Sequence, residues 1–146
     1  MLEKLFTYLK KEQEFIDELI ELAKKQQRAL ISSDMGLLEE VTRYQEALAK
    51  GLQTAENQRI KYLTATLGIS NSEALSLKLS SLKSEATSAE ELERIRLFRN
   101  EMKEKMEKFH EMNITNRMLT NRAMSNVREI LALFSRGGRK VCNVRV

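Results

Sequence analysis

The side chains that perform most enzyme chemistry are few in this chain and stand far apart. His110 is the only histidine and Cys142 the only cysteine. His110 has no second imidazole or nearby thiol, so the chain lacks the ligand set of a usual zinc site. Cys142 has basic neighbours but no histidine partner, which indicates a free thiol near the C-terminus. We therefore expect no metal and no other cofactor.

Two further patterns that can mark catalysis are present only in weak form. The glycines of "RGGRK" follow a predicted helix rather than a strand, and they lack the spacing of a phosphate-binding loop. The adjacent carboxylates Glu39 and Glu40, and likewise Glu90 and Glu91, fall on predicted helix surfaces, where solvated charge is the simpler interpretation. We expect that the protein is not an enzyme.

Charge is distributed unevenly along the 146 residues, which carry a formal net charge of +4. The segment from Asn113 to Val146 has a single acid, Glu129, and seven basic residues: Arg117, Arg122, Arg128, Arg136, Arg139, Lys140 and Arg145. Such a segment suits an acidic partner surface or nucleic acid. The N-terminus mixes Glu and Lys into its first residues, so it predicts neither a signal peptide nor a membrane insertion. We expect a cytoplasmic protein.

Hydrophobic periodicity predicts long helices, and the chain contains no proline to interrupt them. Apolar residues recur every three or four positions from Leu2 to Leu30, from Leu38 to Tyr62 and from Ile95 to Leu133. The turns are predicted at "SSDMG", where Ser33 or Asp34 can cap the next helix, and at "LGISNS", where a glycine can end one. The segment 72–85 is ambiguous, and we interpret it as a short helix.

These elements predict an all-α fold, an elongated antiparallel bundle of three long helices and one short helix. The last long helix begins at a capping box formed by Ser88 and Glu91. Residues 1–135 form one helical domain, and 136–146 form a basic, flexible tail. The last helix is the longest, and we expect its C-terminal part to extend about 20 Å past the first two helices.

The end of the last helix is apolar on all sides. Residues 130–134 read Ile-Leu-Ala-Leu-Phe, and at 100° per residue they surround the helix axis. Neighbours within a small bundle can cover only one face of such a helix. A homodimer or a folded-back tail is one possible cover, and a separate binding partner is the other.

Polar residues interrupt two of the predicted helical stripes. Asn116 and Asn126 fall on the stripe of the last helix, with Asn113 beside it. They either fix the register of helix packing or hydrogen-bond to a partner that must be released. Arg59 lies within the second stripe, where we expect a structural ion pair with Glu3 or Glu12.

The chain resembles the FlgN-type flagellar export chaperones. The similarity rests on an arginine late in the second helix ("AENQRIKYL"), two asparagines in the last helix ("MNITNRML") and the apolar run after them ("VREILALF"). The order of long, long, short and longest helix agrees along nearly the whole chain. The tail differs, because "RGGRKVCNVRV" has no aromatic residue where members of that family often carry a tyrosine.

The resemblance implies a cytosolic chaperone in flagellar type III export. It would bind the C-terminal helical segment of the hook-associated proteins, which join hook to filament, and deliver them to the flagellar export apparatus. The residues that we expect to contact this partner lie in the last helix: Met112, Asn113, Asn116, Leu119, Ala123, Val127, Arg128, Ile130, Leu131 and Phe134.

Two alternatives remain open at this stage. A self-associating coiled-coil scaffold would bury the same apolar stripe between copies of the chain. A nucleic-acid-binding helical protein would use the basic C-terminal quarter. No aromatic residues interleave with these arginines and no recognition motif is present, so nucleic acid is not the expected partner.

Overall fold

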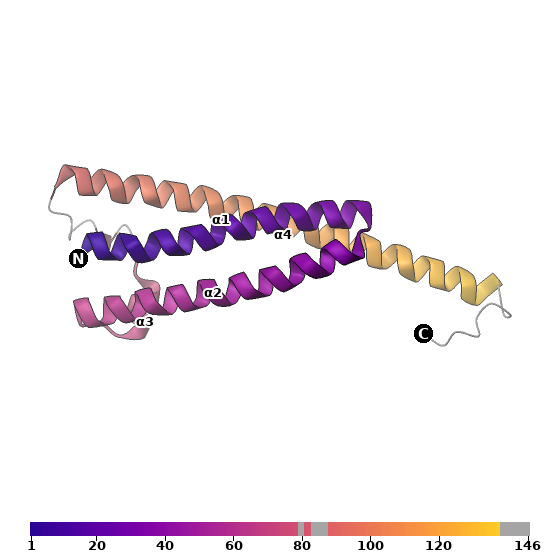
Figure 1. Ribbon diagram of the computed structural model, residues 1–146, viewed down its shortest axis with the longest axis horizontal. Helices are drawn as coiled ribbons and strands as arrows, with labels where there is room; N and C mark the ends of the chain where they lie inside the picture. The colour runs from indigo at the N-terminus through magenta and orange to yellow at the C-terminus, as the bar shows by residue number, and fades with distance from the viewer. Residues whose placement is uncertain (79–80, 83–87, 138–146) are drawn as a thin grey trace.

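The structure, a computed structural model, describes residues 1–78, 81–82 and 88–137, and these residues form helices and no strand. The helices are α1 (Leu2–Ser32), α2 (Met35–Leu67), α3 (Asn71–Ser76) and α4 (Ala89–Gly137). At ~1.5 Å per residue the three long helices measure about 47, 50 and 74 Å. The molecule is a long rod with α4 running beyond one end (Figure 1). The predicted all-α bundle of three long helices and one short helix is confirmed.

The helix ends follow the predicted signals. Ser33 ends α1 in the left-handed conformation (φ 56°), and the Asp34 side chain accepts a hydrogen bond from the Leu37 backbone N–H at 3.0 Å. Gly68 ends α2 with φ 65°, which glycine adopts without steric cost. Ser88 Oγ accepts from the Glu91 N–H at 3.2 Å at the start of α4. One half of the predicted capping box is therefore present.

The segment after α2 is only partly the helix that we predicted over 72–85. α3 ends at Ser76, and Leu77 is extended (ψ 119°). Ala74 is buried, whereas Leu75 is 61% exposed, so the short helix turns its small residue and not its leucine toward the core. Residues 79–80 and 83–87 lie outside the described residues. Of the predicted tail, 136–146, the first two residues belong to α4, which ends at Gly137. Residues 138–146 also lie outside the described residues.

α1 is the central helix of the bundle. It packs extensively against both α2 and α4, whereas α2 and α4 contact each other little. α2 runs antiparallel to α1, and α4 runs parallel to it, because Arg94 near the start of α4 pairs with Glu3 and Lys105 pairs with Asp17. The main core lies at the end farthest from the α1–α2 turn. It contains Leu2, Leu5, Phe6, Leu9, Ile60, Leu63, Ala74, Leu82 and Ile95.

Candidate partner-binding surface

The first part of α4, residues 89–120, packs along α1, and we call it the packed section. Ile95 is buried, and Phe98, whose ring meets that of Phe6 edge to face at 5.8 Å, is half-buried. The Lys105 ammonium lies 2.9 Å from a carboxylate oxygen of Asp17. This apolar stripe with charged borders is the pattern expected of a helix that packs on one face only.

The packed section ends at a polar junction that joins three helices. The Asn116 amide, 3% exposed, donates from Nδ2 to the Ala23 carbonyl at 3.0 Å and to Gln26 Oε1 at 3.2 Å. Gln26 Oε1 also accepts from Gln45 Nε2 of α2 at 2.9 Å. A buried amide is costly unless it is hydrogen-bonded. Sliding α4 by one residue would break these bonds, so Asn116 fixes the register of α4 on α1.

A second buried polar contact joins α1 to α2. Arg59 Nε donates to Glu12 Oε2 at 2.7 Å, and both side chains are largely buried. Burial raises the pKa of the Glu12 carboxyl above its ordinary value of 4.5, and the hydrogen bond and charge of Arg59 oppose that rise. Glu12 is one of the two acids predicted to pair with Arg59. The other, Glu3, pairs with Arg94.

Thr120 is the last residue of α4 that is half-buried, although the helix continues to Gly137. We call residues 121–136 the projecting section, and every one of them is exposed. At ~1.5 Å per residue it extends about 24 Å, and Figure 1 shows it running on past the α1–α2 turn. Its large apolar side chains are each 41–66% exposed: Met124, Val127, Ile130, Leu131, Leu133 and Phe134.

The ten residues predicted to bind the partner divide between the two sections. Six of them belong to the projecting section: Ala123, Val127, Arg128, Ile130, Leu131 and Phe134. Met112, Asn113 and Leu119 are half-buried in the packed section. Asn116, the tenth residue, is buried, and its amide donates to α1. Its hydrogen bonds are of the structural kind considered for the asparagines, and from Asn121 to Arg136 every residue is exposed.

The projecting section combines exposed apolar side chains with positive charge. It carries three arginines, Arg122, Arg128 and Arg136, against one acid, Glu129. Fully burying one side chain such as Leu or Ile contributes about 1.5–3 kcal/mol. Several exposed side chains on one rod therefore favour association with a complementary surface. In the described residues no cluster of acidic, histidine or cysteine side chains could hold a metal, and no helix could span a membrane.

Sequence reasoning missed two features of the surface. Gln26 and Gln45 each interrupt a predicted apolar stripe. A polar residue in the stripe of each of two adjacent helices was the available signal that the two side chains hydrogen-bond to each other. The second feature is a groove of about 350 Å³ between α1 and α2, lined by Asp17, Glu18, Glu21, Leu22, Lys25, Tyr44 and Leu48. No stripe predicts this groove, because it depends on how far apart the two helices lie.

Fold and surface together define a class of protein, an elongated helical bundle with an exposed helix end that carries apolar side chains. A family model described as FlgN protein matches residues 1–143. The chain therefore belongs to the FlgN family, which is a family of flagellar export chaperones. No curated protein and no solved structure compared with the chain matches it.

Proposed function

We propose that this protein is a cytoplasmic chaperone of the flagellar type III export system that binds the C-terminal helical segment of hook-associated proteins. The observation that carries the proposal is the exposure of all residues from 121 to 136, which include six large apolar side chains. An amphipathic helix that waits for its assembly partners exposes an apolar stripe of its own. The projecting section offers such a helix a preformed surface, in the manner of helix-on-helix recognition.

The packed section and the projecting section have separate roles in this proposal. The packed section holds α4 on α1 through Asn116, and the Glu12–Arg59 pair holds α2 on α1. The projecting section binds the client through Val127, Ile130 and Leu131, and Arg128 sets its polarity. The client is masked until it is delivered to the export apparatus. A second copy of the chain is the alternative binding partner for the same surface.

The test is calorimetric titration of the full chain with the C-terminal segment of a hook-associated protein. The double variant Leu131→Asp, Phe134→Asp should lose binding by at least about 100-fold, because two apolar contacts are replaced by charges that must be desolvated. Helicity should be unchanged, since both side chains are exposed. Hydrogen-exchange protection on binding should appear mainly between residues 121 and 136.

The matched control is Leu92→Asp, Leu97→Asp, which changes two similarly exposed apolar residues (41% and 54%) in the packed section of the same helix. This variant should bind the client segment as well as the unmodified chain does. Equal loss in both double variants would show that the effect is not located in the projecting section. Loss of helicity in the first variant would show that its residues belong to the core.

A further inference from the structure

The side of α4 that packs on α1 keeps its apolar character after α1 has ended. Phe98, whose ring meets that of Phe6, and Asn116, which is hydrogen-bonded to Ala23, mark this side. They are 18 residues or about five helical turns apart, so they lie on one line along the helix. At ~100° per residue, four apolar residues of the projecting section lie within about 60° of this line. We call these four residues the continued face: Ala123, Val127, Ile130 and Leu131.

The other side of the projecting section is mostly polar. By the same rotation, Arg122, Glu129 and Arg136 lie about 120–160° from the line through Asn116. Leu133 lies among them, at about 100°. Over its whole length the projecting section is therefore amphipathic, and one helix placed along the continued face would cover most of its apolar surface.

The end of α1 divides this apolar side of α4 into a covered part and an exposed part. α1 and α4 run parallel, with Lys105 opposite Asp17 and Asn116 opposite Gln26. Residues that differ by roughly 90 in number therefore lie side by side, and the end of α1 at Ser32 is level with about the start of the projecting section. All four residues of the continued face lie beyond that level.

We propose that the client helix binds on the continued face and extends the position that α1 occupies along the packed section. This inference rests on the proposed function, and it assigns the client to one side of α4. The same side of the packed section is already covered by α1. The client helix must therefore end or turn away at the α1–α2 turn, and its contact with α4 is limited to about four helical turns.

The chemistry of the α1–α4 interface indicates which kind of helix fits. There α4 supplies bases and α1 supplies acids, because Arg94 pairs with Glu3 and Lys105 pairs with Asp17. The projecting section has three arginines against one acid, and Arg128 borders the continued face. The client is therefore an amphipathic helix with acidic residues beside its apolar stripe. A second projecting section has the same excess of arginine and fits this border less well.

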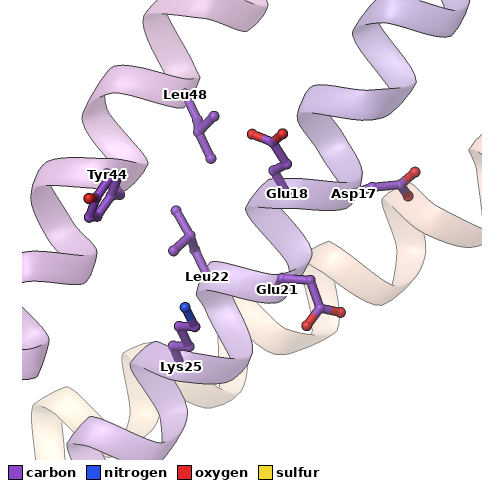
Figure 2. Close-up of a pocket in the computed structure, with 7 residues that line it drawn as sticks. All are labelled: Asp17, Glu18, Glu21, Leu22, Lys25, Tyr44 and Leu48. Carbon is purple, nitrogen blue, oxygen red and sulfur yellow. The ribbon is translucent and has the colours of Figure 1, made fainter.

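The groove between α1 and α2 is a separate surface. Leu22 and Leu48 point into the space between the two helices (Figure 2), and none of the described residues that line the groove belongs to α4. Tyr44, which lines it, is 58% exposed. A client bound in this groove would leave the continued face exposed, so a probe at Tyr44 distinguishes the two positions.

Cysteine labelling of the full chain locates the client. Three variants are made in a chain that carries Cys142→Ser: Val127→Cys on the continued face, Leu133→Cys on the polar side and Tyr44→Cys in the groove. The three positions are 56%, 66% and 58% exposed, so their thiols should react with a maleimide at similar rates in the free chain. A saturating client segment should slow the reaction of Val127→Cys at least about tenfold and the other two less than about twofold, because only the first thiol is covered.

A matched pair of charge reversals tests the acidic border of the client by calorimetric titration. Arg128→Glu should weaken client binding about fivefold, because it places an acid against that border. Arg136→Glu makes the same change on the polar side of the same section and should weaken binding less than about twofold. Equal weakening by the two variants would overturn the assignment of Arg128 to the border, because the arginines would then act only through the net charge.

The labelling pattern separates failure of this inference from failure of the proposed function. Protection of Leu133→Cys or Tyr44→Cys as strong as that of Val127→Cys would overturn the inference and leave the client in place. Slow labelling of Val127→Cys without client would also overturn it. If that slow labelling depended on protein concentration, a second copy would cover the face, and otherwise the chain itself would cover it. No heat of binding and no protection at any position would overturn both proposals.

Discussion

The packed and projecting sections of α4 belong to one uninterrupted helix, yet they have opposite surroundings. Residues 89–120 bury a stripe against α1, and residues 121–136 bury nothing. Composition does not separate them, because both contain large apolar residues at helical spacing, and both contain asparagine and arginine. What differs is the length of the scaffold beside them, since α1 ends at Ser32. A side chain of the same type therefore has a folding role in one section and is exposed to solvent in the other.

The largest expected difference in the free energy of unfolding is between replacing a buried arginine and replacing an exposed one. Arg59→Met should destabilise the fold by about 3–5 kcal/mol at neutral pH, because it leaves the Glu12 carboxylate buried without its partner. Arg128→Met, which changes an exposed arginine of the projecting section, should change stability by less than about 0.5 kcal/mol. Urea unfolding followed by circular dichroism would measure both. A loss of stability from Arg128→Met as large as that from Arg59→Met would contradict the exposure of the projecting section.

The same variant makes a prediction about pH. Removing Arg59 removes the two effects that oppose the rise in the Glu12 pKa, so this pKa should rise further above 4.5. A carboxyl whose pKa is higher in the folded state binds protons preferentially there, and stability falls as the pH rises through the window above 4.5. The loss caused by Arg59→Met should therefore be smaller at pH 5 than at pH 7.5. A loss that does not depend on pH would show that Glu12 is not responsible.

Apolar truncation should give the next largest difference. Ile95→Ala removes a side chain that is 1% exposed in the core and should cost about 2–4 kcal/mol. Leu133→Ala, at 66% exposure, should cost less than about 0.5 kcal/mol. Thermal unfolding of the two variants side by side would measure this. A large loss for Leu133→Ala in dilute monomer would place the end of α4 in a core.

The asparagines should give the smallest effects, and these effects should differ in sign. Asn116→Ala removes the hydrogen bonds to Ala23 and Gln26 and should cost about 1–2 kcal/mol. Asn126→Ala, at an exposed helical position, should stabilise the protein by about 0.5 kcal/mol or less, because alanine is the better helix former. Denaturant midpoints at equal slope would resolve the two. Effects of equal sign would remove the distinction between a register residue and a surface residue.

Much of this fold could be predicted from periodicity and end signals. Three long helices follow from the apolar stripes and from the end signals at Asp34, Gly68 and Ser88. Each end signal lies within a few residues of the helix end that it sets. The short α3 was predicted less well, since six residues carry too little pattern to show which side faces the core. The difference in burial between Asn116 and Asn126 could not be predicted either. Both fall on one stripe, and only the end of α1 decides which of them is covered.

The candidate surface could be predicted as a segment but not in its limits. The apolar run at 130–134 indicated the end of α4, whereas Met112, Asn113 and Leu119 were included because they lie on or beside the same stripe. The groove around Leu22 and Leu48 was not predicted. It depends on side chains from two helices, and it is open because α4 packs against a different face of α1. Surfaces made by one helix are readable from sequence, and surfaces made between helices require coordinates.

The continuity of α4 across Thr120 and Asn121 has a consequence for how the exposed end remains helical. A free 16-residue peptide in water is at best a marginal helix, because starting the first turn is unfavourable while adding further residues is not. In α4 the anchored residues supply that nucleus, and the exposed residues only propagate it. A proline placed at the boundary would interrupt the helix, so that the exposed residues could no longer propagate it from the anchored residues. The outer turns would then melt, without any change to the side chains that they carry.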